Sequence, residues 1–215
     1  LLFIKGGFMK KGFTLAEVLI TLGVIGVVAA LTMPALISNY RKNVVVERLK
    51  KFYTVMNQAV LQATEEYGDW KQWDVSEENS LVDNYLKKYL KILKTEHKNN
   101  KNYYYFPDGS MFYPVYSEAD IRNSKEFVFC PVASKCEKRG VEKFNFVFNT
   151  VSYDFNLTTL KNPIEPYTWQ WTGKREDLFK GSFGCAAETS DGNDYCAALI
   201  MIDGWRISKD YPFRF

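Results

Sequence analysis

One carboxylate lies inside the most apolar stretch of this chain. Between Phe13 and Ile37 the residues are apolar, Gly, Pro or Thr, and Glu17 is the only charged one. A helix of about 20 such residues spans the hydrocarbon core of a bilayer. An ionisable group at that depth costs about 3 kcal/mol or more and marks function, because it needs a partner. No Lys, Arg or His lies between Phe13 and Asn39, so we expect the partner to come from another chain or from a newly made terminus.

A short basic segment, Met9-Lys10-Lys11-Gly12, leads directly into Phe13 and the apolar stretch. Glu17 is then the fifth residue after Gly12. The arrangement resembles the class III signal of type IV pilins and pseudopilins, and two further matches are Gly26 and Pro34, where family members commonly carry a helix breaker. The resemblance covers residues 10–68 and is specific in its first dozen residues. It implies that a prepilin peptidase cuts between Gly12 and Phe13 and then N-methylates the new terminal Phe13.

The resemblance also implies a role for Glu17. Cleavage exposes a cationic amine on Phe13 that stays protonated after methylation. In the family, the carboxylate at this position is thought to pair with the terminal amine of an adjacent subunit, which neutralises both charges in apolar surroundings. Pairing within one subunit stays open from the sequence, because the first and fifth residues of a helix lie about one turn apart.

An ordinary secretory signal peptide is the alternative for this segment. Val28-Ala29-Ala30 satisfies the small-residue rule for a cleavage site, and two lysines precede the apolar run. Against it, a carboxylate lies in the would-be apolar core, the apolar run continues past the would-be cut, and a helical pattern follows without a break. Ahead of Met9, residues 1–8 allow two interpretations: untranslated sequence included by a misplaced start, or a genuine longer leader.

The helical pattern after the apolar stretch becomes amphipathic. Apolar residues recur at steps of three and four, which places them on one face of a helix: Val45, Leu49, Phe52, Met56, Ala59, Val60, Ala63 and Tyr67. Gly68 is a suitable helix stop. We therefore predict one helix of about 50 residues, or roughly 80 Å. The predicted organisation is a leader (1–12), a membrane and assembly half of the helix (13–37), an amphipathic half (38–68) and an extracytoplasmic head (69–215).

All four cysteines lie in the predicted head, at Cys130, Cys136, Cys185 and Cys196. An even number of cysteines after an export signal indicates two disulfides formed in an oxidising compartment. Among the three connectivities we expect nearest neighbours to pair, 130 with 136 and 185 with 196. A zinc site is the alternative, but the spacings are not CxxC and the only histidine, His97, is remote. Basic residues flank the apolar stretch on both sides, so the orientation rests on the leader and the cysteines.

The head is predicted to combine one helix with antiparallel strands. The helix is expected at Ser80–Lys94, followed by a solvated loop at Lys94–Asn102. The expected strands are Tyr103–Phe106 and Met111–Val115 around a Pro107-Asp108-Gly109 turn, then Phe127–Pro131, Phe144–Phe148, Val151–Phe155, and a hairpin of Ala197–Ile202 and Trp205–Ile207 around Asp203-Gly204. The predicted fold class is α+β, a pilin-like arrangement of a long N-terminal helix packed on an antiparallel sheet.

Little in the head suggests chemistry. Asp191, Asn193 and Asp194 offer oxygens to Ca²⁺, and some related pseudopilins bind calcium in a C-terminal loop. The spacing does not fit a complete EF-hand loop, so we favour a solvated turn. The sequence contains no phosphate-binding loop, nucleophile elbow or HExxH motif, and no cofactor is predicted. The chain is more a substrate of enzymes than an enzyme.

The leading interpretation is a pilin-like subunit held in the inner membrane as a single-pass protein and built into a periplasmic or cell-surface filament. Its expected partners are other pilin or pseudopilin subunits, the prepilin peptidase, an inner-membrane assembly platform and membrane lipid. A net charge of +3 gives no electrostatic case for nucleic acid. A type II secretion pseudopilus and a type IV pilus both remain open. The alternatives are a DNA-uptake or adhesive minor pilin and a membrane-anchored secreted enzyme.

Overall fold

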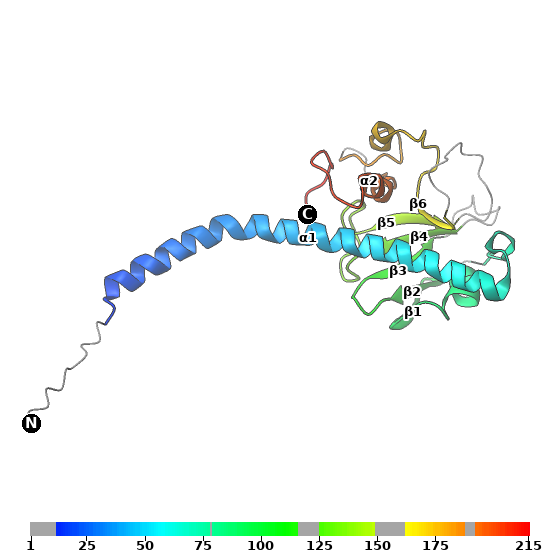
Figure 1. Ribbon diagram of the computed structural model, residues 1–215, viewed down its shortest axis with the longest axis horizontal. Coiled ribbons are helices and arrows are strands. Elements are labelled where there is room, and N and C mark those ends of the chain that lie inside the picture. Colours follow the sequence, from blue (N-terminus) through cyan, green and yellow to red (C-terminus); the bar gives the residue numbers. More distant parts are fainter. Residues whose placement is uncertain (1–11, 78, 116–124, 149–161, 188–191) are drawn as a thin grey trace, which may run out of the picture. The chain divides into compact units, whose positions relative to one another are not determined.

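The computed structural model describes residues 12–77, 79–115, 125–148, 162–187 and 192–215 (Figure 1). Two compact units divide the chain, Leu1–Tyr40 and Arg41–Phe215. Helix α1, Leu15–Tyr67, contributes residues to both units. The second unit contains the sheet and the second α-helix, so the amphipathic end of α1 belongs to the folded head.

The single long helix predicted from the sequence is confirmed. α1 has 53 residues and runs through Pro34 without interruption, although proline cannot donate a backbone hydrogen bond. It ends where predicted, at Gly68, whose φ of 80° is in the left-handed region. The Gly68 N–H donates to the Thr64 carbonyl over 3.0 Å, which closes the last turn as a C-terminal cap.

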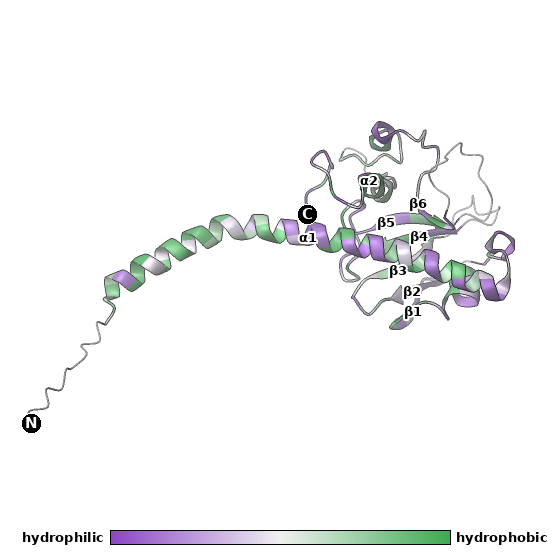
Figure 2. Ribbon diagram, in the orientation of Figure 1, coloured by the Kyte–Doolittle hydropathy of each residue, from purple (hydrophilic) through white to green (hydrophobic). Residues whose placement is uncertain are grey.

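The hydropathy of α1 changes along its length, as Figure 2 shows. Apolar residues cover the first part on all sides, whereas polar residues alternate with apolar ones after Tyr40. In the second unit, the buried residues of α1 form one stripe: Val45, Val46, Leu49, Phe52, Met56, Asn57, Ala59, Val60 and Ala63. The predicted amphipathic face is therefore the face that enters the core.

The head is built on a six-stranded antiparallel sheet with its strands in sequence order, β1 to β6 (Figure 1). The strands are β1 (Lys94–Lys98), β2 (Lys101–Tyr105), β3 (Met111–Val115), β4 (Lys125–Cys130), β5 (Phe144–Phe148) and β6 (Ile164–Pro166). This confirms the predicted α+β class. The predicted strand at Val151–Phe155 lies outside the described residues.

Phe52 of α1 is the centre of the aromatic core between the helix and the sheet. Its ring stacks on Phe129 of β4 with centroids 4.3 Å apart, and it meets Phe146 of β5 edge-on at 5.0 Å. Phe112 of β3 and Phe106 lie 5.4 and 6.4 Å away. Offset and edge-to-face contacts of this kind add to the free energy gained by burying apolar area. One helical side chain thus joins three neighbouring strands.

Asn57 connects α1 to the last strand. Its side-chain Nδ2 donates to the Ile164 carbonyl over 2.9 Å, and its Oδ1 accepts from the Ile164 N–H over 3.0 Å. Ile164 begins β6, which lies at one edge of the sheet. The carboxamide thus satisfies both backbone groups that a further strand would otherwise pair with. These two hydrogen bonds explain why a polar side chain is buried at position 57.

We predict that Asn57→Leu lowers the free energy of unfolding by about 2–4 kcal/mol, because it leaves the N–H and the carbonyl of Ile164 buried without partners. The measurement is urea denaturation of the purified chain in detergent, followed by tryptophan fluorescence. Gln58→Leu is the matched control, since Gln58 is exposed on the same helix and should change stability by less than about 0.5 kcal/mol. Equal stability of the two variants would contradict the role assigned to Asn57.

The structure corrects the prediction for residues 80–102. Instead of a helix over Ser80–Lys94, it has one short π-helix, Leu81–Leu86, and the chain joins the sheet at Leu93, whose N–H donates to the Tyr105 carbonyl. Instead of a loop over Lys94–Asn102, strands β1 and β2 form a hairpin. The turn residues Asn99 and Asn100 have φ values of 51° and 61°, as a type I′ hairpin turn requires. The Asn-Asn pair was the missed turn signal.

The predicted C-terminal hairpin is also wrong. Cys196–Ile202 forms a helix, α2, that is buried from Cys196 to Ile200. A short continuous apolar run does not distinguish a buried strand from a buried helix. Asp203-Gly204 ends this helix instead of turning a hairpin, with Gly204 at a φ of 77°. By contrast, the hairpin around Pro107-Asp108-Gly109 is confirmed by the pairing of β2 with β3.

Two disulfides crosslink segments within the head. Cys130 bonds Cys136, and Cys185 bonds Cys196, which are the nearest-neighbour pairs. The first pair closes a small loop after β4, and the second attaches Cys185 to the first residue of α2. Both crosslinks remove conformational freedom from the unfolded chain and so favour the folded head.

Candidate processing and assembly site

Gly12 and Phe13 precede the helix and are accessible. Neither residue belongs to a helix or strand, and Phe13 exposes 88% of its surface. A Cβ placed on Gly12 would have no atom within 4 Å. Exposed segments outside helices and strands are the preferred sites of proteolytic cleavage. The geometry is therefore compatible with cleavage between these two residues.

Glu17 and Thr14 form a capping box at the start of α1. The Thr14 N–H donates to Glu17 Oε2 over 2.8 Å, and the Glu17 N–H donates to Thr14 Oγ1 over 3.2 Å. The threonine hydroxyl also donates to Glu17 Oε2, over 2.9 Å. Two backbone donors that have no partner within the helix are thereby satisfied. The prediction for Glu17 overlooked this local role, although the Thr-x-x-Glu spacing was visible in the sequence.

The capping box does not depend on the leader. Its Thr14 N–H belongs to the peptide bond between Phe13 and Thr14, so it remains after a cut between Gly12 and Phe13. Both hydrogen bonds to the carboxylate use Oε2. Within the described part of the chain, the structure shows no hydrogen bond or ion pair at Glu17 Oε1. One oxygen of the acid caps its own helix, while the other is available to a cation.

The apolar part of α1 is exposed on all sides in the isolated chain. The exposed large side chains are Leu15, Val18, Leu19, Ile20, Leu22, Val24, Ile25, Val27, Val28, Leu31, Met33, Leu36 and Ile37. The few hydroxyls bond within the helix: Thr21 donates to the Val18 carbonyl and Thr32 to the Val28 carbonyl. Among the described residues, α1 is the one helix long and apolar enough to cross a membrane.

Gly23 and Gly26 lie in this apolar part, and nothing comes within 4 Å of a Cβ placed on either one. Small residues let the backbone of a neighbouring helix approach closely. Pro34 follows Gly26 about two turns later and leaves the carbonyl of Ala30 without its usual donor. All three residues are exposed on the isolated chain.

The residues considered for calcium are used otherwise. Asp191 lies outside the described residues. Asn193 Oδ1 accepts from the Ala186 N–H over 2.8 Å. Asp194 pairs with the Arg139 guanidinium and accepts from Asn145 Nδ2. Burial raises the pKa of Asp194 to about 6, against the opposing effect of Arg139. An arginine already occupies this carboxylate, and in the described ranges no three His, Cys, Asp or Glu residues are grouped to hold a metal.

His97, which was expected in a solvated loop, is part of the sheet. It lies on β1 directly opposite Asn102 of β2, and its Nδ1 is 2.8 Å from Asn102 Oδ1. His97 is exposed, whereas Asn102 is half-buried. The interaction connects the two strands and gives the imidazole a structural partner.

Comparison with known proteins identifies two families along the chain. Residues 8–33 match the prokaryotic N-terminal methylation motif. Residues 35–215 match a family described as a family of unknown function, DUF6613. No curated protein and no solved structure matches the chain. The methylation motif covers the predicted cleavage site between Gly12 and Phe13, Glu17 and most of the apolar part of α1. The chain therefore belongs to the DUF6613 family and is a prepilin-type protein of the type IV pilin and pseudopilin class.

Proposed function

We propose that this protein is a structural subunit of a pseudopilus or pilus-like filament. A prepilin peptidase cuts between Gly12 and Phe13 and methylates Phe13, and an assembly platform in the inner membrane then moves the subunit from lipid into the filament. The supporting observation is a helix whose first part is apolar and exposed on every side, with one acid, while its second part is the core helix of a folded head.

The exposed apolar part needs surroundings that are free of water. At about 25 cal/mol for each Å² of apolar surface removed from water, leaving these side chains in solution is strongly unfavourable. Lipid provides such surroundings before assembly, and equivalent helices of other subunits provide them in a filament. The helix leaves the bilayer only when those neighbours replace the lipid.

Glu17 favours the transfer of the helix from lipid into the filament. A carboxylate in apolar surroundings is costly unless a cation pairs with it. In our proposal, the methylated amine of Phe13 on an adjacent subunit pairs with Glu17 Oε1, while Oε2 keeps the capping box with Thr14. Both charges are then neutralised in the bundle of helices. Gly23, Gly26 and Pro34 lie on the surface that this bundle buries.

The two disulfides support placing the head outside the cytoplasm. Disulfides form and persist in oxidising compartments, and the head contains two, Cys130–Cys136 and Cys185–Cys196. The proposed location is the inner membrane with the head on the periplasmic side, followed by a periplasmic or cell-surface filament.

A DNA-binding head receives less support than a filament subunit. Stacked aromatic rings with free cations would favour nucleic acid. Lys94 does lie over the Tyr105 ring, 4.3 Å from its centroid, but it also pairs with Glu96 at 2.5 Å. Lys88 lies over Tyr89 and pairs with Glu66 in the same way. In both places an acid neutralises the lysine.

The proposed function is tested by the mature N-terminus and by the location of the protein. Mass spectrometry of protein isolated from sheared surface and periplasmic fractions should show a chain that begins with N-methylated Phe13. The same fractions should contain filaments that an antibody against the head labels in electron microscopy. A peptidase-null strain is the control and should retain the unprocessed precursor in the membrane. A mature chain with any other first residue, or one never found in filaments, would overturn the proposal.

A further inference from the structure

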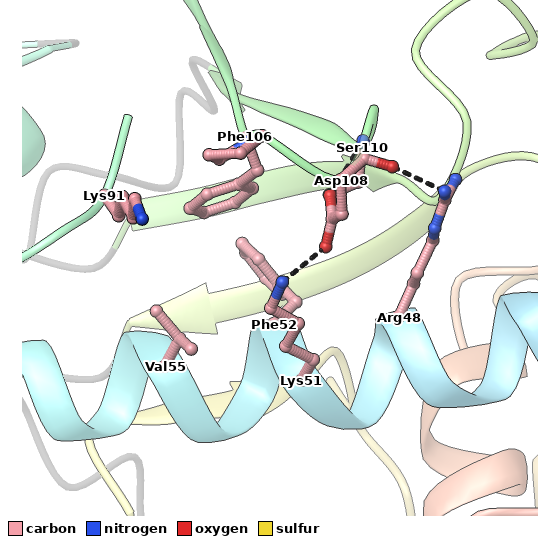
Figure 3. A pocket seen from close by; sticks show the side chains of 9 residues that line it. Arg48, Lys51, Phe52, Val55, Lys91, Phe106, Asp108 and Ser110 are labelled. Carbon is pink, nitrogen blue, oxygen red and sulfur yellow. Dashed lines mark hydrogen bonds and ion pairs between the residues drawn. The ribbon is translucent and has the colours of Figure 1, made fainter. Parts of the chain in front are cut away.

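A small pocket opens beside α1 in the head, between the helix and the turn that joins β2 to β3 (Figure 3). Its volume is about 210 Å³, and Phe52, Val55 and Phe106 form its apolar part. Pockets that hold substrates or cofactors usually measure about 300–1,000 Å³. This pocket therefore has the size to accept a side chain and not a substrate molecule.

Three cationic residues line the pocket, and two of them are engaged within the chain. Arg48 donates to the carbonyls of Asp108 and Pro131. Lys51 Nζ is 2.7 Å from Asp108 Oδ2. The third, Lys91, lies at the end of the pocket away from Arg48 (Figure 3). Its ammonium group has no hydrogen bond or ion pair anywhere in the described ranges. The pocket thus offers an apolar floor and one available positive charge.

A complementary feature lies on α1 itself. Leu61 is a large apolar side chain of the folded head and exposes 58% of its surface. Glu65 is four residues further on and so lies on the same face of the helix. Glu65 is exposed and makes no ion pair with any described residue, whereas the adjacent Glu66 is bound by Lys88. We call Leu61 and Glu65 the knob.

The knob and the pocket cannot meet within one chain. Nine residues separate Phe52 from Leu61, which is about 13 Å along the helix and about half a turn around it. Leu61 therefore lies too far along α1 to enter the pocket of its own chain. A contact between them needs two copies and uses a different surface on each copy. A contact of this heterologous kind, when it does not close into a ring, builds an open filament.

We propose that the knob of one subunit enters the pocket of the next subunit in the filament. Leu61 covers the apolar floor formed by Phe52 and Phe106, and Glu65 pairs with Lys91 of that neighbour. This inference rests on the proposed filament function and adds the surface through which the heads contact each other. From the spacing along α1, the two subunits are offset by roughly 15 Å in the helix direction.

Charge reversal tests the pair in the full-length protein, expressed with its own assembly system. We expect Lys91→Glu and Glu65→Lys each to reduce sheared filament at least about fivefold, because a repulsive pair replaces an attractive one at every repeated contact. The double variant, with the charges exchanged, should restore filament to within about twofold of the starting protein. Lys98→Glu is the control, since Lys98 is an exposed lysine on β1, away from the pocket.

Photo-crosslinking tests the position of the knob. A photoreactive amino acid at position 61 should crosslink in assembled filaments to a peptide of a second copy that contains Phe106 or Lys91. The same probe at Glu47, exposed elsewhere on α1, should not label that peptide.

The outcomes separate this contact from the filament function. Filaments that form normally in Lys91→Glu, or position-61 crosslinks that map away from the pocket, would overturn the contact and leave the filament proposal standing. The absence of filaments from the unmodified protein would overturn both.

Discussion

Replacing Glu17 with Ala should abolish entry into filaments while leaving cleavage after Gly12 intact. Removing one partner of a buried ion pair leaves the other charge without compensation, which costs about 3–5 kcal/mol. That corresponds to a hundredfold or larger loss in the equilibrium for each subunit added. The measurement compares the amount of processed protein in the membrane with the amount in sheared filaments. We expect processed Glu17→Ala protein to accumulate in the membrane.

The capping box requires a second variant, because Glu17 has two roles in the structure. Glu17→Gln keeps a side chain that is able to cap the helix at this position but has no negative charge. If the charge is what assembly needs, Gln should fail as Ala does. Thr14→Ser, which retains the hydroxyl that bonds Glu17 Oε2, should assemble normally. Normal filament yield from Glu17→Gln would show that capping, and not pairing with a terminal amine, explains the acid.

Phe52→Ala should be the most damaging single truncation in the head. Phe52 is 2% exposed and contacts the rings of Phe106, Phe112, Phe129 and Phe146. Truncating a buried Phe to Ala typically costs about 3–5 kcal/mol, because it removes apolar burial and leaves a cavity. Native domains have only about 5–15 kcal/mol of stability. The variant should therefore lose a large share of the free energy that stabilises the folded head.

Urea denaturation of the purified chain in detergent measures this loss. Phe52→Leu should cost much less than Ala, since it retains most of the buried volume. Leu61→Ala is the control for truncating an apolar residue on the same helix, because Leu61 is largely exposed. A loss below about 1 kcal/mol for Phe52→Ala would mean that the helix and the sheet do not depend on this residue.

The long helix and its ends were predictable because local sequence patterns specify them. The apolar run, the change to an amphipathic pattern near Tyr40 and the stop at Gly68 are each set by neighbouring residues. The same holds for the hairpin at Pro107-Asp108-Gly109. The capping box is local as well, because the Thr-x-x-Glu spacing of Thr14 and Glu17 is a sequence signature of a helix start.

Other features depend on contacts between distant parts of the chain. In the sequence, Asn57 is one polar residue among many in a helix. Its role depends on its contact with Ile164, which is 107 residues later in the chain. The uniformly apolar run Ala197–Ile202 was predicted to be a strand. In the structure it is part of a helix that is mostly buried against the rest of the head. At Lys94–Lys98, five exposed residues form a strand because the Asn99-Asn100 turn folds them back onto β2.

The continuity of α1 has a mechanical consequence. Phe52 and Asn57, which tie the head together, lie on the same unbroken helix as the apolar segment that a membrane or a bundle of subunits would grip. Tension applied to that segment is transmitted through the backbone of α1 to the residues that pack in the aromatic core. The load then acts in shear, parallel to the helix axis, and is shared by many side chains at once. This arrangement should make the head resistant to unfolding by force applied along α1.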